Sequence, residues 1–96
     1  VYLSPAERAS ALALSRSLHA AVVEWRAGER DAAVLRRVVD EMLGRETGIA
    51  VDYVAIVEPE RLTPVTQANP GVILALAARV GKTRLIDNVI LGEPHD

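Results

Sequence analysis

The segment Gly81-Lys82-Thr83 comes nearest, by residue type, to a phosphate-binding loop. Such a loop has another glycine at the fifth position before Gly-Lys-Thr and a helix after the threonine, so that backbone amides and the lysine surround the phosphates. Position 76 is occupied by Leu76, and a strand-like run follows Thr83. The segment therefore indicates the turn of a β-hairpin rather than a phosphate site.

Neither histidine of the chain predicts a metal site. His19 lies within a helical pattern and His95 lies in a polar tail, and neither has a second ligand at the spacing that zinc sites use. The chain has no cysteine, which excludes disulfides, thiolate catalysis and cysteine-ligated zinc. The serines have no His–Asp arrangement near them in the sequence, so nucleophilic catalysis has no support.

Two carboxylates, Asp52 and Asp87, interrupt apolar strands. A buried carboxylate must be paired or hydrogen-bonded, and Asp87 has Arg79 and Arg84 nearby in the hairpin. We expect a structural contact there, with a place in an active-site wall as the alternative. Arg84, Asp87 and Asn88 are the most site-like residues of the chain. Arg84 and Asp87 are three apart in a strand and would face opposite sides, so they cannot form a simple catalytic pair.

The composition suits one small domain without an electrostatic case for nucleic acid. The chain has 96 residues, 50% of them hydrophobic, and a net charge of −2, whereas nucleic-acid binding uses a clustered basic surface. No apolar run reaches the roughly 18 residues that span a bilayer, and no signal-peptide layout is present. These features predict a cytoplasmic protein. Because the first residue is Val1, we expect a fragment of a longer protein.

Two amphipathic helices are predicted in the first half of the chain. Ser4-Pro5-Ala6-Glu7 has the residues of a capping box, with proline at the first helical position. Gly28 suits the end of this helix. The first helix carries apolar residues at spacings of three and four, namely Ala11, Leu14, Leu18, Ala21, Val22 and Trp25. The second helix, about 31–45, has a similar stripe, namely Val34, Leu35, Val38, Val39, Met42 and Leu43.

Three strands follow, at 50–57, 72–79 and 84–91, with a turn at 80–83. The order α-α-β-β-β predicts an α+β fold, a two-layer sandwich in which the two N-terminal helices pack on a three-stranded antiparallel sheet. Both faces of the middle strand are apolar, although the helices need only one. We therefore expect the second face to meet a missing domain or another copy of the chain, and the isolated chain to self-associate.

The chain resembles the pantothenate synthetase (pantoate–β-alanine ligase) family over essentially its full length. Residues 78–88, Ala-Arg-Val-Gly-Lys-Thr-Arg-Leu-Ile-Asp-Asn, are similar to the closing segment of that family. Val51-Asp52-Tyr53-Val54 resembles a strand of the family, and Tyr2-Leu3 resembles the residues that follow its Ser-Ser-Arg-Asn loop.

The resemblance implies that residues 1–96 form a single domain, the C-terminal lid of a ligase whose N-terminal Rossmann-like domain is absent. It implies condensation of pantoate with β-alanine, driven by ATP through pantoyl adenylate, with AMP and pyrophosphate as products. The family's nucleotide-binding motifs, His-x-Gly-His and Ser-Ser-Arg-Asn, do not occur in this chain. We therefore assign it no catalytic, cofactor-binding or metal-binding residue and expect the fragment to be inactive, with ATP and Mg²⁺ bound only by the full-length enzyme.

The partners that the resemblance implies are the nucleotide-binding domain of the same enzyme, the small-molecule substrates of the full enzyme, and a second subunit of a homodimer. Neither nucleic acid nor a membrane is expected as a partner. The alternative reading is a free-standing small α+β interaction or ligand-binding module. The residues encoded upstream of Val1 distinguish the two, because the ligase reading requires a Rossmann-type half there.

Overall fold

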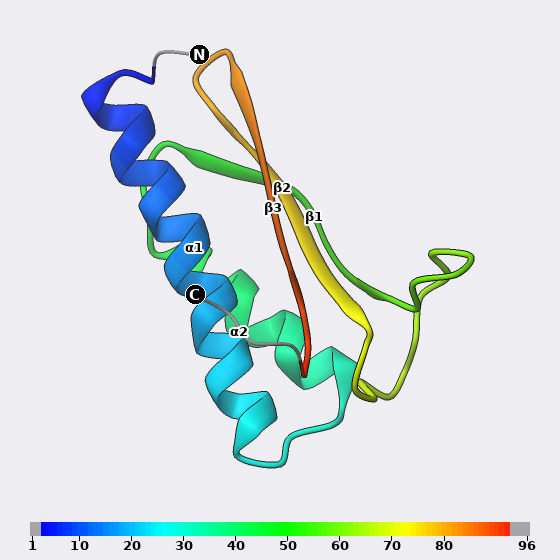
Figure 1. Ribbon diagram of the computed structural model, residues 1–96. Coiled ribbons are helices and arrows are strands. Elements are labelled where there is room, and N and C mark those ends of the chain that lie inside the picture. Colours follow the sequence, from blue (N-terminus) through cyan, green and yellow to red (C-terminus); the bar gives the residue numbers. More distant parts are fainter. Residues whose placement is uncertain (1–2, 93–96) are drawn as a thin grey trace.

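Two helices pack on one side of a three-stranded antiparallel sheet in the computed structural model, which describes residues 3–92 (Figure 1). The elements follow in the order α-α-β-β-β, so the predicted two-layer α+β fold is confirmed. Val1, Tyr2 and the tail that contains His95 lie outside the described residues. The expectations that involve them stay predictions.

Helix α1, Pro5–Arg26, begins with the capping box that the sequence predicts. The Glu7 amide donates to the Ser4 hydroxyl oxygen over 3.1 Å, and the Ser4 amide donates to the Glu7 carboxylate over 2.8 Å. These bonds satisfy backbone amides that would otherwise lack partners at the start of the helix. After the C-cap residue Ala27, Gly28 has a φ of 115°, a backbone conformation that glycine adopts readily.

Helix α2, Ala32–Gly44, is also capped at its start, because the Asp31 carboxylate accepts a hydrogen bond from the Ala33 amide over 2.9 Å. Its bounds lie just inside the predicted 31–45. The predicted apolar stripe lies against the core, and its members are buried or half-buried: Val34, Leu35, Val38, Val39, Met42 and Leu43.

The sheet has the strand order β1-β2-β3, with β1 at Ile49–Val57, β2 at Ile73–Val80 and β3 at Thr83–Ile90. Each strand boundary lies within one residue of the predicted one. Val80 pairs with Thr83, so the hairpin closes through the two residues Gly81 and Lys82. Gly81 has a φ of 59°, and tight hairpin turns need a positive φ at their first central residue. The predicted turn is confirmed.

The core fills the space between the helices and one face of the sheet, which we call the helix-facing side. Leu74 and Leu76 of β2 are both 0% exposed there. Helix residues meet them from the other layer, and half-buried strand residues complete the packing. The most fully buried of the large core side chains are Leu14, Leu18, Leu35, Val39, Leu43, Ile56, Leu74, Leu76 and Leu91.

The connection between β1 and β2 includes a loop at 58–64 that projects beyond the sheet, at the right of Figure 1. The Glu58 carboxylate organises this loop by accepting from the amides of Glu60, Arg61 and Thr63 and from the Thr63 hydroxyl, over 2.7–3.2 Å. Hydrogen bonds to the charged form lower the pKa of Glu58, the backbone bond from Thr63 foremost. Farther along, the Trp25 indole donates to the Ala68 carbonyl over 2.7 Å and so ties the connection to α1.

Candidate functional site

The face of the sheet that points away from the helices carries a large apolar surface, which we call the open face. Within residues 3–92, no helix lies over it. Three large hydrophobic side chains stand out on it: Tyr53 is 41% exposed, Ile86 60% and Ile90 41%. The strand register places further residues on the same face, namely Ala50, Ala55, Val57, Ile73, Ala75, Ala77, Arg79, Arg84 and Asn88.

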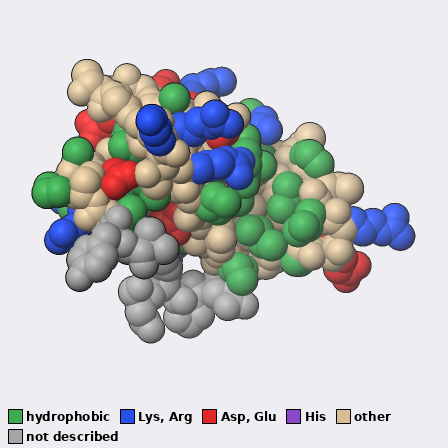
Figure 2. Space-filling model, turned by 90° about the horizontal axis from the view of Figure 1, so that it is seen from above, with side chains coloured by type: hydrophobic (Ala, Val, Ile, Leu, Met, Phe, Trp, Pro, Cys, Tyr) green, Lys and Arg blue, Asp and Glu red, His purple; other side chains and the backbone are tan. Residues whose placement is uncertain are grey.

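Side chains of the open face also pack against one another across neighbouring strands. Ala77 of β2 pairs directly with Tyr53 on one side and with Ile86 on the other. It is 0% exposed although it lies outside the core cluster. Cross-strand neighbours of this kind stabilise a sheet from the face that they share. Seen from the end that carries the β2–β3 turn, hydrophobic side chains gather beside a group of Lys and Arg side chains (Figure 2).

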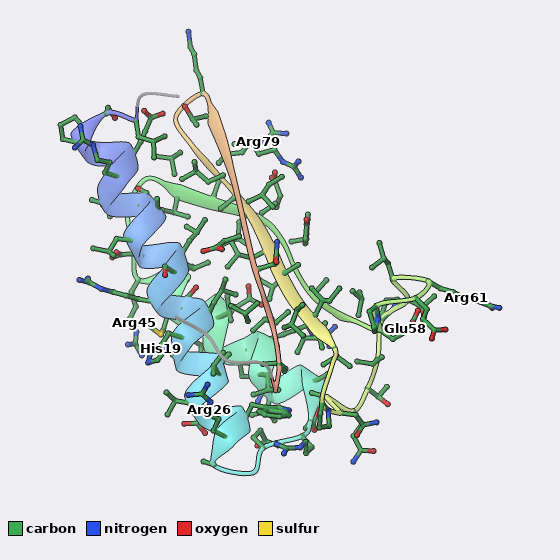
Figure 3. All side chains as sticks on the ribbon, in the orientation of Figure 1. His19, Arg26, Arg45, Glu58, Arg61 and Arg79 are labelled. Carbon is green, nitrogen blue, oxygen red and sulfur yellow. The ribbon has the colours of Figure 1, made fainter. Side chains whose placement is uncertain are left out.

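A charged cluster occupies the end of the open face near that turn, where Arg79 is labelled in Figure 3. The Asp52 carboxylate accepts from the Arg84 Nε over 3.1 Å and from the Arg79 Nε over 3.3 Å, through the same oxygen. The bond from Arg84 is the main cause that lowers the pKa of Asp52. The arginine side chains are 66% and 48% exposed, so this pairing stabilises the isolated chain little.

A β-bulge puts Asp52 in this position. The register between β1 and β2 shifts between Val51 and Tyr53, so Asp52 is an extra residue in its strand. Val51 and Val54 face the core, whereas Tyr53 lies on the open face. Simple alternation from Val51 would have placed Tyr53 on the helix-facing side.

The structure separates the three residues that the sequence singles out. Arg84 and Asn88 lie on the open face, whereas Asp87 lies on the helix-facing side, as their spacing predicts. The expected contact of Asp87 with Arg79 and Arg84 is wrong, because both guanidinium groups bond to Asp52. The Asp87 carboxylate instead accepts from the Asn88 amide over 2.9 Å. The sequence does not reveal that the arginines pair with Asp52 instead of Asp87, since this pairing depends on the bulge.

A second polar link joins the start of α1 to the hairpin. The Thr83 hydroxyl donates to the Glu7 carboxylate, across 76 positions of sequence. This bond is the largest cause that lowers the pKa of Glu7, followed by the two bonds with Ser4. The sequence predicts Glu7 as a capping residue but gives no signal of its partner in β3.

Metal-ligand clusters and helices that could cross a membrane can be assessed for the described residues. Within residues 3–92, no three His, Asp or Glu side chains are grouped closely enough to hold a metal ion. His19 is exposed on α1 (Figure 3). Neither α1 nor α2 combines the length and the apolar character that crossing a membrane requires.

Residues 1–90 match the model of the family described as pantoate-beta-alanine ligase. The bifunctional pantoate ligase/cytidylate kinase of Gloeobacter violaceus is 54% identical over 97 residues, which cover 100% of this chain and 19% of the relative. The pantothenate synthetase of Pelotomaculum thermopropionicum is 50% identical over 93 residues, covering 97% of this chain and 33% of the relative.

Solved structures give the same match. The crystal structure of pantothenate synthetase from Thermus thermophilus has a TM-score of 0.84 and 36% identity, covering 94% of this chain and 32% of that one. The chain therefore spans between 19% and 33% of the length of these proteins.

Proposed function

We propose that this chain, which belongs to the pantoate–β-alanine ligase family, is the C-terminal lid domain of an ATP-dependent ligase that condenses pantoate with β-alanine. The family match carries the proposed activity, and the observation that carries the role of a lid is the open face, an apolar sheet surface that nothing covers within residues 3–92. Exposed apolar surfaces of this kind mark interaction sites. The chain matches 33% of the length of one pantothenate synthetase relative, and we propose that the part of the protein corresponding to the rest of that relative covers the face.

The occupant that we propose for the open face is the nucleotide-binding domain of the same polypeptide. Interfaces within one chain combine apolar contact with polar pairs at the margin, and the open face has this composition. Tyr53, Ile86 and Ile90 supply the apolar part, while Arg79 and Arg84 stand at the hairpin end and, within residues 3–92, share the single carboxylate of Asp52. Acidic or phosphate groups on the partner would complement the remaining positive charge.

The proposed reaction has two steps. Pantoate attacks the α-phosphate of ATP, forming pantoyl adenylate and releasing pyrophosphate. The amine of β-alanine then attacks the acyl carbon, the C–N bond forms as the bond to the AMP oxygen breaks, and the amine loses a proton. Because water competes for the adenylate, a lid with an apolar inner surface protects the intermediate by excluding water.

We place ATP binding, Mg²⁺ binding and catalysis in the remainder of the protein. Three carboxylates of this chain already have partners: Asp52 bonds to two arginines, Glu7 to Ser4 and Thr83, and Glu58 to the amides of its loop. Among residues 3–92, moreover, no three carboxylate or histidine side chains are grouped to hold a cation, so the part of the chain that the structure describes does not fit a Mg²⁺ site built from free carboxylates and water. A homodimeric full-length enzyme and a cytoplasmic location stay predictions.

A direct experiment compares the full-length protein with the 96-residue chain, each incubated with ATP, Mg²⁺, pantoate and β-alanine. We expect pantothenate and AMP from the full-length protein and neither product from the chain. Calorimetry of the chain with ATP and Mg²⁺ should show no micromolar binding. Pantothenate formation by the chain alone, or its absence with the full-length protein, would contradict the proposal.

A further inference from the structure

Glu7 performs two tasks at the start of α1. One carboxylate oxygen closes the capping box with the Ser4 amide over 2.8 Å, and the other accepts the Thr83 hydroxyl. Arg8 adds a bond to the same segment, from its Nε to the Leu3 carbonyl over 3.3 Å. A single side chain thus connects the entry of the chain into α1 with the first residue of β3.

Core packing is sparse at this end of the molecule. None of the residues 5–12 of α1 is buried, and the buried stripe of the helix starts at Ala13. A hollow of about 330 Å³ lies between the start of α1 and the end of the sheet, with Ala6, Ser10 and Val80 in its lining. The apolar contact that fixes the rest of α1 is therefore thin here, and the bond from Thr83 to Glu7 bridges the two layers.

We propose that Glu7 and Thr83 are positioning residues, which hold the β2–β3 hairpin at a fixed place relative to the chain segment that enters α1. Thr83 follows the turn directly and faces the helices, while its neighbour Arg84 faces outward beside Arg79. Fixing Thr83 consequently fixes where the charged end of the open face points. This inference rests on the proposed function, in which that segment connects the lid to the nucleotide-binding domain.

The test uses Thr83→Val in the full-length protein, because valine keeps the β-branched shape, loses the hydroxyl and leaves the capping box of Glu7 in place. Thr83→Ser restores the hydroxyl without the methyl group. Thr66→Val, at an exposed threonine in the β1–β2 connection, is the matched control for a threonine-to-valine change. Each variant is measured by amide hydrogen exchange of the peptide 80–85, by melting temperature, and by kcat and KM for each substrate.

We expect Thr83→Val to speed exchange in peptide 80–85 about tenfold and to lower kcat about fivefold, with melting and KM nearly unchanged. Thr83→Ser should recover both values, and Thr66→Val should match the wild type. Unchanged exchange in Thr83→Val would overturn the link itself, and faster exchange with wild-type kcat would overturn its role in positioning. Failure of Thr83→Ser to recover kcat would also contradict the proposal. A wild-type protein that makes no pantothenate would instead reject the proposed function, while the exchange measurement would still test the link.

Discussion

The two faces of the sheet are built from similar apolar residues but differ in how much of their surface is exposed to solvent. On the helix-facing side, Leu74 and Leu76 are 0% exposed beneath two helices. On the open face, Ile86 is 60% exposed and Tyr53 is 41% exposed. Burial of apolar area stabilises a fold by roughly 25 cal/mol per Å², so the helix-facing side holds the chain together. The open face keeps much of its apolar area available for another surface.

This difference separates stability from interaction within one small sheet. An antiparallel sheet that packs against the core with one face normally carries polar residues on the other, solvent-exposed face. Here Asp52, Arg79, Arg84 and Asn88 are the polar members of the open face, and three of them form one cluster at the hairpin end. The remainder of the face is apolar and partly exposed. Burying it against another surface would stabilise association. Substitutions on the two sides should therefore affect different measurements.

The largest effect should come from the helix-facing side. Leu74→Ala removes a fully buried side chain at the centre of β2 and should lower the free energy of unfolding by about 2–5 kcal/mol, through lost burial and a residual cavity. Ile86→Ala, on the open face, should cost less than about 1 kcal/mol in the isolated chain, because most of its side chain is exposed already. Urea unfolding monitored by circular dichroism measures both values. Equal losses at the two positions would remove the distinction between the faces.

The second effect concerns association. The isolated chain should self-associate through the open face, and Ile86→Glu should shift it toward monomer in sedimentation or light scattering, because a charge there must be desolvated on contact. In the full-length protein the same change should lower kcat/KM about tenfold, equivalent to roughly 1.4 kcal/mol. Leu12→Glu is the matched control, since Leu12 is 50% exposed on α1. A chain that stays strictly monomeric at high concentration, together with unaffected activity in Ile86→Glu, would refute the role of this face.

A third effect is the acid sensitivity of the polar links. The pKa values of Glu7, Asp52 and Glu58 are all lowered by hydrogen bonds to their charged forms. A group whose pKa is lower in the folded state contributes stability above its unfolded value, here 4.5 for Glu and 3.8 for Asp. That contribution is lost as the pH falls through the lowered folded value.

The melting temperature should therefore be nearly constant toward neutral pH and should fall once the pH drops below these ordinary values. Asp52→Asn on the open face should reduce this fall slightly, because one of the three contributing carboxylates is gone. The measurement is a series of thermal melts from neutral pH to about pH 3. A melting temperature that rises on acidification would contradict the assigned directions.

The sequence predicted local features well and long-range polar contacts poorly. Capping at Ser4, the apolar stripes and the turn at Gly81 follow from neighbouring residues, and all were confirmed. The bulge at Asp52 depends on how β1 aligns with β2, and the bond between Glu7 and Thr83 joins positions 76 apart. Such contacts arise from tertiary packing, which residue spacing does not encode. For that reason the sequence placed the arginines near Asp87 and gave no partner for Asp52, which pairs with both of them.

The smallest effect should be that of Asp87, where the structure revises the expectation from the sequence. A carboxylate with buried partners would cost about 1–3 kcal/mol to remove. Asp87 instead accepts the amide of Asn88 in an exposed hydrogen bond on β3, an edge strand. Water can replace this acceptor, so Asp87→Ala should lower the free energy of unfolding by less than about 1 kcal/mol.

The Asp87 side chain also lies on the helix-facing side, away from the proposed partner domain. Asp87→Ala should consequently leave kcat of the full-length protein within about twofold of wild type, as thermal melts and steady-state kinetics can establish. Asn88→Ala, the neighbouring change on the open face, is the comparison and should reduce kcat more. If Asp87→Ala melts normally while kcat falls a hundredfold, equivalent to roughly 2.7 kcal/mol, then Asp87 acts in the active site. In that case the helix-facing side would contribute to catalysis, and the assignment of stability to that side and of interaction to the open face would be wrong.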